Sequence, residues 1–378
     1  MDLALSFLRP AARHGYGEKT GTRGLAVEGL VTSLNTTTPW QLALPARGTF
    51  GFSGPSGSGK STLLAALAGQ RACSGRVSFA GMCWQEGTWG LAAHQRDLVL
   101  GFQDVRLFAG QTVADNLALA HRYSRRRLAH EERAGLIEAF GIAPLLGQPV
   151  EQLSGGEAQR VALLRQLFSN AAVQLYDEPL SAVDRSQVLR GLIPALRAFW
   201  ARNPALVIWT SHDFNEIQLL ASHCLWMEEA ALRGPVAVRE LIGFQASGES
   251  AEHSCCSRLE ARVESCEAGL LTLSLGDVLL YADNVVGCHR PGDIVPFLLG
   301  SGDISLSLER PGLSSILNCL PAELLAMVPV ADGRVRLELG ACGQAFCADI
   351  SRLSRERLQL EVGRRYFAQF KAGSLTGL

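Results

Sequence analysis

The segment Gly54–Thr62 constrains the fold of this chain more than any other part of the sequence. It consists of Gly54, Pro55, Ser56, Gly57, Ser58, Gly59, Lys60, Ser61 and Thr62. The run Thr49–Ser53 predicts a strand before it, and Lys60–Ala68 predicts a helix after it. The glycines let the backbone wrap around a phosphate group, and the helix start offers N–H groups and a positive dipole end. Lys60 can then reach the β- and γ-phosphates, and Ser61 can bind Mg²⁺.

This motif predicts nucleotide binding but does not by itself separate kinases, GTPases and transport ATPases. A second acidic segment narrows the chemistry. The apolar run that begins at Val173 ends in Asp177 and Glu178. A carboxylate at the end of such a strand can hold Mg²⁺ through water, and the next carboxylate can act as general base on an attacking water.

Short apolar runs alternate with helical stretches from Phe50 to about Phe244. Val173–Tyr176 and Leu206–Thr210 are continuous apolar runs, which is typical of strands buried on both faces. Two more strands are predicted before the glycine-rich loop, at Leu25–Val31 and Trp40–Leu44. The alternation predicts a parallel α/β sheet.

The composition changes after Ser247. Residues 246–257 are small and polar and are interpreted as a linker between a first domain, 1–245, and a second, 258–378. Turn pairs such as Gly276-Asp277 and Pro291-Gly292 predict an all-β second domain. This domain also repeats: Leu273–Gly276, Tyr281–Asp283 and Pro291–Phe297 are followed later by Leu337–Gly340, Phe346–Asp349 and Val362–Phe367. Two similar small β-barrels are therefore expected.

Charge and cysteine usage exclude several classes of function. The net charge of -1 gives no reason to expect nucleic acid as a partner, and the four arginines within Arg122–Arg127 are interpreted as a solvated helix face. The ten cysteines include no C-x-x-C pair, so the sequence does not predict a zinc cage. We expect the cysteines to be reduced thiols. No apolar stretch of about 18 residues predicts a membrane span, so a transport role would require a membrane partner.

The segment Leu153–Arg160 carries the family resemblance. It contains Ser154, Gly155, Gly156 and Glu157 at the predicted start of the helix Glu157–Phe168. Together with the glycine-rich loop and Asp177-Glu178, this segment resembles the signature of the ABC ATPases over residues 25–245. The resemblance implies a P-loop NTPase fold, of mixed α/β class, with a helical subdomain between Gln103 and Ser154.

Further roles are implied by this resemblance alone. Gln103 matches the Q-loop residue that senses Mg²⁺, Ser181–Asp184 matches the D-loop with Asp184, and His212 matches the switch histidine near the γ-phosphate. Members of the family sandwich two ATP molecules between two chains, so that Ser154 and Gly156 of one chain close on ATP held by the other. A homodimer and an integral membrane permease dimer are therefore expected partners. The expected location is the cytoplasmic side of the inner membrane.

One departure concerns adenine. The family usually carries an aromatic residue upstream of the phosphate loop that stacks on the base. Here the corresponding segment, Gly29–Leu34, contains no aromatic residue, and Trp40 is the nearest. Stacking of this kind contributes about 1–3 kcal/mol, so adenine binding is expected to be weaker or to be supplied by another side chain.

The second domain points to a cargo. Gly312–Ala322 resembles the opening of the molybdate-binding (Mop-like, OB-like) module of molybdate-importer ATPases, here about 312–378, and Leu44–Gly48 and Asp303–Pro311 also match such proteins. An oxyanion needs several N–H and O–H donors, and the candidates are Ser314, Ser315, Ser351 and Lys371. The alternative for each serine is a turn cap. Leu317 also stands where an arginine is often found in such importers.

Four hypotheses remain open. The first is an importer ATPase for molybdate or tungstate, supplied by a periplasmic or extracellular oxyanion-binding protein. The second keeps the ATPase but changes the cargo to sulfate, ferric iron or another solute. The third is a non-transport ABC ATPase acting on DNA or ribosomes, which the neutral charge opposes. The fourth is an oxyanion sensor or store, which the intact ATP-site residues oppose.

Overall fold

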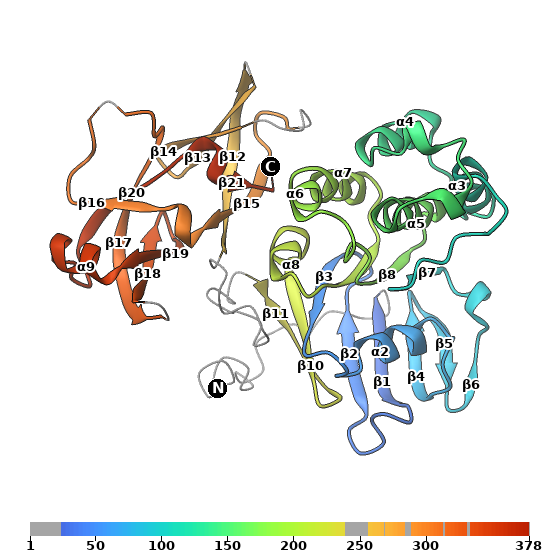
Figure 1. Ribbon diagram of the computed structural model, residues 1–378. Coiled ribbons are helices and arrows are strands. Elements are labelled where there is room, and N and C mark those ends of the chain that lie inside the picture. The colour runs from blue at the N-terminus through green and yellow to red at the C-terminus, as the bar shows by residue number, and fades with distance from the viewer. Residues whose placement is uncertain are drawn as a thin grey trace. The chain divides into compact units, whose positions relative to one another are not determined.

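The computed structural model describes residues 24–238, 256–267, 269–283, 289–312, 314–330 and 333–377. The described chain forms two compact units, shown in Figure 1. The first contains residues 24–188 and 195–238, and the second contains 189–194 together with the described residues from 256 onward. Most of the predicted linker, 246–255, lies outside the described residues, and its last two residues belong to a strand of the second unit.

An antiparallel sheet of five strands forms one part of the first unit. Its order is β2-β1-β4-β5-β6. The strands are β1 (Leu25–Val31), β2 (Trp40–Leu44), β4 (Ser74–Phe79), β5 (Met82–Glu86) and β6 (Trp89–Gly90). The bounds of β1 and β2 confirm the sequence prediction. Alternate residues of β1 and β2 are buried, which places one face of these strands on the core.

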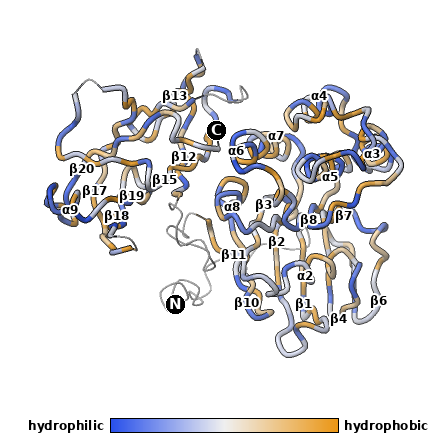
Figure 2. Tube along the Cα trace, viewed as in Figure 1, coloured by the Kyte–Doolittle hydropathy of each residue, from blue (hydrophilic) through white to orange (hydrophobic). Residues whose placement is uncertain are grey.

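The second sheet is the predicted parallel one. Its order is β11-β10-β3-β9-β8-β7, and all neighbouring pairs are parallel except β10–β11. The strands are β3 (Gly48–Ser53), β7 (Leu98–Gly101), β8 (Val173–Asp177), β9 (Leu206–Thr210), β10 (His223–Glu228) and β11 (Ala231–Ala237). Every residue of β8 and β9 is buried, as expected for central strands of a parallel sheet. Figure 2 shows hydrophobic segments along this part of the trace.

Helices connect these strands and build a helical region between β7 and β8. They are α2 (Lys60–Leu67), α3 (Val113–Arg122), α4 (His130–Ala139), α5 (Gly155–Ser169), α6 (Arg185–Gln187), α7 (Ile193–Arg202) and α8 (Phe214–Leu220). Thr112 caps the start of α3 and Ser154 caps the start of α5, each with a capping box that satisfies N–H groups at the helix start. Helix α5 packs on α3 and on β7, and α8 packs on β3. Among the described residues, no helix is both long and apolar enough to cross a membrane.

The second unit consists mainly of strands in two further sheets. One has the order β14-β13-β12-β15-β21 and the other β16-β20-β17-β18-β19. The strands are β12 (Cys256–Glu267), β13 (Leu270–Leu275), β14 (Val278–Asp283), β15 (Ile294–Gly300), β16 (Ser305–Ser307), β17 (Asn318–Pro329), β18 (Arg334–Ala341), β19 (Gln344–Ser351), β20 (Arg365–Phe370) and β21 (Leu375–Thr376). Buried residues of both sheets form one hydrophobic core.

The predicted duplication is confirmed by the pairing of the strands. In both halves a long strand pairs with its hairpin partner through a register shift, between Val263 and Ser265 in β12 and between Leu324 and Ala326 in β17. The predicted alignment was wrong in its first segment. Because Val263 pairs with Leu273 and Leu324 pairs with Leu339, Leu273 corresponds to Leu339 and not to Leu337.

The two halves exchange their last strands. Strand β16 follows the first half in sequence but pairs with β20 of the second, and β21 follows the second half but pairs with β15 of the first. The all-β character predicted for the second domain is confirmed, and the structure adds one feature that was not predicted, the helix α9 (Arg352–Leu358) between β19 and β20. Its start is stabilised by Ser351, whose hydroxyl accepts a hydrogen bond from the Ser354 N–H.

Candidate nucleotide-hydrolysis site

The predicted site residues lie at one edge of the parallel sheet. Strands β3, β7, β8 and β9 run parallel, so their carboxyl ends meet at the same edge (Figure 1). The phosphate loop follows β3, Gln103 follows β7, Glu178 follows β8 and His212 follows β9. The edge where such strands end is the usual place for ligands in open α/β sheets. Side chains that are up to about 160 positions apart in the chain therefore come together.

The phosphate loop needs glycine at two positions. Gly54 has φ of 146° and Gly59 has φ of 111°, values that residues with a side chain rarely adopt. A Cβ atom on Gly54 would lie 2.0 Å from the Met227 carbonyl oxygen, and one on Gly59 would lie 2.6 Å from Leu34 Cδ2. Among the described residues, the Ser58 hydroxyl is buried without a hydrogen-bond partner. A loop with an unsatisfied donor at a helix start fits a phosphate group.

Lys60 lies inside this loop. Its side chain is buried, and Nζ donates hydrogen bonds to the carbonyl oxygens of Gly54 at 2.8 Å and Pro55 at 2.9 Å. Burial lowers the pKa of Lys60, and the charges of Glu178 and Asp177 partly offset this effect. The ammonium group is thus held in the loop, between phosphate-binding backbone and the two carboxylates.

A hydrogen-bond relay positions the two carboxylates. The Thr210 hydroxyl donates to Asp177 Oδ1 at 3.0 Å and accepts from the Glu178 N–H at 2.8 Å. Asp177 is only 8% exposed, and Glu178 has a left-handed φ of 48°, which is uncommon for a residue with a side chain. Thr210 at the end of β9 therefore fixes the turn at which the chain passes from Asp177 to Glu178.

Glu178 contacts both of the other predicted catalytic side chains. His212 Nε2 lies 2.7 Å from Glu178 Oε1, and Gln103 Nε2 donates to Glu178 Oε2 at 3.4 Å. The Glu178 side chain is 14% exposed and that of His212 is 53% exposed. Water can therefore reach this cluster, and a carboxylate with a histidine beside it can accept a proton from an attacking water.

The predicted Mg²⁺ ligands also belong to this edge. Ser61 is the second residue of α2, Asp177 ends β8, and Gln103 keeps its amide oxygen available because its nitrogen bonds Glu178. Hydroxyl, carboxylate and amide oxygens are the ligand types that Mg²⁺ prefers, and the ion keeps several waters besides them. The chemistry of these side chains fits the ion.

The signature segment carries an exposed helix start. Ser154 N–H and hydroxyl both donate to Glu157 Oε2, at 2.8 and 2.7 Å, and these hydrogen bonds hold the pKa of Glu157 below its usual range. Ser154 and Gly155 are exposed. The S-x-x-E spacing of a capping box is visible in the sequence, so this arrangement is one that sequence analysis could have found.

Helix α5 also holds the D-loop. Gln159 Nε2 donates to the Ser181 hydroxyl at 3.0 Å, and its Oε1 accepts from the Ala182 N–H at 2.7 Å. The carboxylate of Asp184, the predicted D-loop residue, accepts from the Gln187 N–H and caps α6. The signature helix and the D-loop are therefore connected through one buried amide, which sequence analysis did not single out.

Trp40 cannot stack on a nucleotide base, because it is 1% exposed and its Nε1 donates to the Ala230 carbonyl at 2.7 Å. The side chains nearest to Gly59 are those of Leu34, Met227 and Trp40; Met227 and Trp40 are buried, whereas Leu34 is 43% exposed. Asn35 holds this turn by accepting hydrogen bonds from the Thr32 N–H and hydroxyl. Leu34 is therefore the side chain at the rim of the phosphate loop that an adenine ring could contact.

The four oxyanion candidates do not form one cluster. Asn318 pairs with Phe370, so Ser314, Ser315 and Lys371 lie beyond the same end of the β17–β20 pair. Ser351 pairs with Arg334 at the other end of that sheet. Ser314 accepts from the Ile316 N–H and Ser351 caps α9, so both act as turn or helix caps. Leu317 is 50% exposed.

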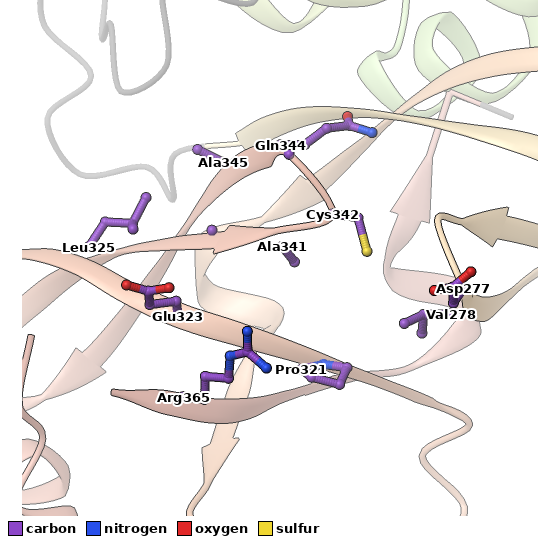
Figure 3. Close-up of a pocket in the computed structure, with 12 residues that line it drawn as sticks. Asp277, Val278, Pro321, Glu323, Leu325, Ala341, Cys342, Gln344, Ala345 and Arg365 are labelled. Atoms are coloured by element: carbon purple, nitrogen blue, oxygen red, sulfur yellow. The ribbon is translucent and has the colours of Figure 1, made fainter. Parts of the chain in front are cut away.

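A pocket of about 660 Å³ opens in the second unit, and Figure 3 shows the residues that line it. Two carboxylates, Asp277 and Glu323, line it beside Arg365. More negative than positive charge surrounds it, and none of the four oxyanion candidates is among its lining residues. The pocket is therefore poorly suited to a doubly charged oxyanion.

Comparison with known proteins agrees with this geometry. The ABC transporter family matches residues 38–181, and the TOBE domain family matches residues 314–376. Molybdenum import ATP-binding protein ModC of Rhodopseudomonas palustris strain HaA2 is 37% identical over 347 residues, covering 88% of this chain and 90% of that protein. The ModC protein of Pseudomonas aeruginosa is 35% identical over 341 residues, covering 88% of this chain and 93% of that protein.

Two matches are more partial. ModC 2 of Bradyrhizobium diazoefficiens is 34% identical over 88% of this chain, which spans 38% of that longer protein. A solved structure, a bacterial Atm1-family ABC exporter with ATP bound, aligns with 57% of this chain and 39% of its own at 22% identity and a TM-score of 0.47, which is too distant to add to the assignment. On the two matches that cover most of both proteins, the chain belongs to the ABC transporter ATP-binding family that contains the molybdenum import ATP-binding proteins.

Proposed function

We propose that this chain hydrolyses ATP to drive the uptake of molybdate, or of the similar tungstate, through a membrane permease. The observation that carries the hydrolytic part is the cluster of Gln103, Glu178 and His212 beside the phosphate loop. Relatives named as molybdenum import proteins support the cargo.

In the proposed reaction the phosphate loop and the start of α2 bind the β- and γ-phosphates, and Lys60 exchanges its carbonyl partners for phosphate oxygens. Glu178 accepts a proton from the attacking water, and His212 orients that carboxylate and contacts the γ-phosphate. Mg²⁺, held by Ser61, Gln103 and Asp177, would neutralise charge on the phosphates. Leu34 provides an apolar contact for adenine in place of a stacked ring.

We further propose that two copies of the chain act together. Ser154 and Gly155 are exposed at the start of α5, where N–H groups and the helix dipole favour an anion. In a head-to-tail pair this helix start would meet ATP bound by the other copy, and the Ser154 hydroxyl would leave Glu157 to bind it. A permease dimer would hold the pair at the cytoplasmic side of the inner membrane, and an oxyanion-binding protein outside would deliver the cargo.

Uptake in cells tests the cargo. Cells that lack their own molybdate importer would express this chain with its permease and binding protein, and cellular molybdenum, tungsten, sulfur and iron would be measured by mass spectrometry. The chain with Lys60→Ala serves as the control without ATP use. Accumulation of molybdenum that depends on Lys60 supports the proposal. Accumulation of sulfur or iron without molybdenum would instead identify sulfate or iron as the cargo.

A second role for the tail is favoured by specific contacts. Ser314 and Ser351 already cap local structure, and Leu317, three residues after Ser314, has an exposed apolar side chain. These contacts favour a tail that shapes the dimer without binding oxyanion. Calorimetry of the full chain with molybdate, tungstate and sulfate separates the two roles, because heat that disappears in Lys371→Ala requires an oxyanion site and no heat from any of the three indicates a structural tail.

A further inference from the structure

A buried glutamate lies on the helix that follows His212 of the candidate catalytic cluster in the chain. Glu216 belongs to α8, which follows His212 in the chain, and it is 8% exposed. Its Oε2 accepts a hydrogen bond from Trp209 Nε1 at 2.9 Å, and its carboxylate also accepts from the Ser211 hydroxyl. A buried carboxyl group costs free energy unless its partners offset the loss of water, and neither the phosphate loop nor the catalytic cluster uses this one.

The partners of Glu216 lead to the segment Ser211–Asp213, which we call the switch segment. The Ser211 hydroxyl accepts from the Asp213 N–H at 3.0 Å, while it donates to Glu216. Asp213 Oδ2 in turn lies 2.9 Å from Arg185 Nε, next to Asp184 in the D-loop. Between Ser211 and Asp213 stands His212, which lies 2.7 Å from Glu178. One carboxyl group thus anchors the turn that carries the histidine.

Trp209, the other hydrogen-bond partner of Glu216, is held in place by packed aromatic side chains. The Trp209 ring centroid lies 5.2 Å from that of Tyr176 and 6.1 Å from that of Trp200, and Tyr176 and Trp200 both donate to Gln174 Oε1 at 2.9 Å. Tyr176 and Trp209 are fully buried. Packed aromatic side chains with satisfied polar atoms hold a fixed geometry. The hydrogen bond from the Trp209 N–H therefore holds the Glu216 carboxyl group in one position.

The charge of Glu216 changes near neutral pH. Burial raises the pKa of Glu216 to about 7, and the neighbouring Asp213 carboxylate raises it too, while donors Trp209 and Ser211 and the charge of Arg185 act in the opposite direction. Strand β3, on which α8 packs, reads Gly-Thr-Phe-Gly-Phe-Ser and carries no titratable side chain. Asp213 and Arg185 are the charged groups that act on it.

We propose that Glu216 is a positioning residue for ATP hydrolysis: as a carboxylate it holds Ser211, and through Ser211 it sets the switch segment so that His212 meets Glu178 and Asp213 meets Arg185. The inference rests on the proposed ATPase function and extends it to a buried residue outside the cluster of Gln103, Glu178 and His212. A neutral carboxyl group accepts a weaker hydrogen bond from the Ser211 hydroxyl than a carboxylate does. Protonation of Glu216 therefore weakens the contact that holds the switch segment in place.

The test compares the full chain with Glu216→Gln, with Glu138→Gln as a matched control that makes the same change on exposed α4. ATP hydrolysis with Mg²⁺ is measured from pH 5.5 to 8.5, and kcat and KM are separated. At pH 8 we expect Glu216→Gln to lower kcat about 3- to 30-fold, since small misplacements of catalytic groups have effects of this order, with KM for ATP little changed. At pH 5.5, where Glu216 is neutral in the native chain, the two should have similar kcat. The ratio of the native kcat to the kcat of Glu216→Gln at each pH cancels the effect of every other group that titrates in both proteins.

Thermal melting of the same samples separates positioning from stability. The native pKa lies above the unfolded one, so stability from this group is present at low pH and is lost as pH rises from about 4.5 to 7. Glu216→Gln does not undergo this loss and should be at least as stable as the native chain at pH 8, although it is slower. Trp209→Phe, which removes the N–H donor and keeps a ring, should also lower kcat at pH 8.

A ratio of kcat values that stays constant with pH, or that equals one at pH 8, would overturn the positioning role. So would a loss of kcat accompanied by a lower melting temperature at pH 8, because that pattern describes a structural residue. Absence of hydrolysis by the native chain at every pH would instead overturn the proposed function, and the positioning role with it.

Discussion

Replacement of Glu178 by glutamine isolates the proton-accepting role proposed for this carboxylate. The glutamine amide has nearly the same shape, and its oxygen can still accept a hydrogen bond from His212, which lies 2.7 Å from Glu178 Oε1 in the native chain. The Thr210 hydroxyl still accepts the N–H of residue 178, because that contact is made by the backbone. The substitution therefore keeps the turn and removes a group that can take a proton from water.

Loss of a general base slows a reaction by about 10²–10⁴-fold, which corresponds to about 2.7–5.4 kcal/mol of activation free energy at 1.36 kcal/mol per tenfold. Phosphate release by the full chain at saturating ATP and Mg²⁺ measures this loss. Binding of a fluorescent ATP analogue should change less than about threefold, since Lys60 and the phosphate loop are untouched. Hydrolysis at the native rate, or equal losses of binding and turnover, would refute the assignment; Glu138→Gln again serves as the control.

Three further outcomes are expected. Leu34→Trp should tighten ATP binding by about 1 kcal/mol, roughly fivefold, because it adds an exposed ring beside Gly59, where the exposed side chain is now aliphatic. Leu34→Ala should weaken binding, and unchanged affinity in both variants would remove Leu34 from the adenine site. Arg336→Met should destabilise the second unit by about 3–5 kcal/mol, measured by denaturant unfolding. The Asp349 side chain is only 4% exposed, and the substitution removes the Nε and Nη2 donors that lie 2.7 and 2.8 Å from its carboxylate oxygens. A loss under about 1 kcal/mol would contradict a buried ion pair. Burial opposes ionisation of Asp349, yet hydrogen bonds from Arg336 and Ser301 hold its pKa below the usual range. The ionised carboxylate therefore stabilises the fold above about pH 4, and this stabilisation is lost as pH falls through the native pKa. The free energy of unfolding of Asp349→Asn should lack this dependence on acid pH.

Much of the hydrolysis site is predictable because local sequence determines it. The phosphate loop requires glycines, and continuous apolar runs identify β8 and β9, whose carboxyl ends must meet if the sheet is parallel. The capping box of Ser154 and Glu157 is also a local pattern. These parts depend on neighbours within a few residues, and their position in space follows from the sheet topology alone.

Other parts depend on contacts between distant segments and were missed. Leu34 matters because Gly59 lies beside it, and Glu216 matters because Trp209 and Ser211 donate to it inside the fold. Helix α9 was missed because the turn pairs of this region predict strands, and Ser351, which caps the helix, was considered only as an oxyanion donor or a turn cap. The alignment of the repeat failed by two residues because strand periodicity is itself two, so a shift of that size keeps every side chain on the correct face.

The exchange of β16 and β21 gives the tail a property that neither half has alone. A chain cut after residue 312 would keep β15 without β21 and would carry β16 without β20. Each severed half would expose one unpaired edge and one orphan strand, and two such halves could restore both pairings by docking on each other. The tail is thus an association of two like modules made permanent by a covalent connection, and its halves are expected to melt in a single transition.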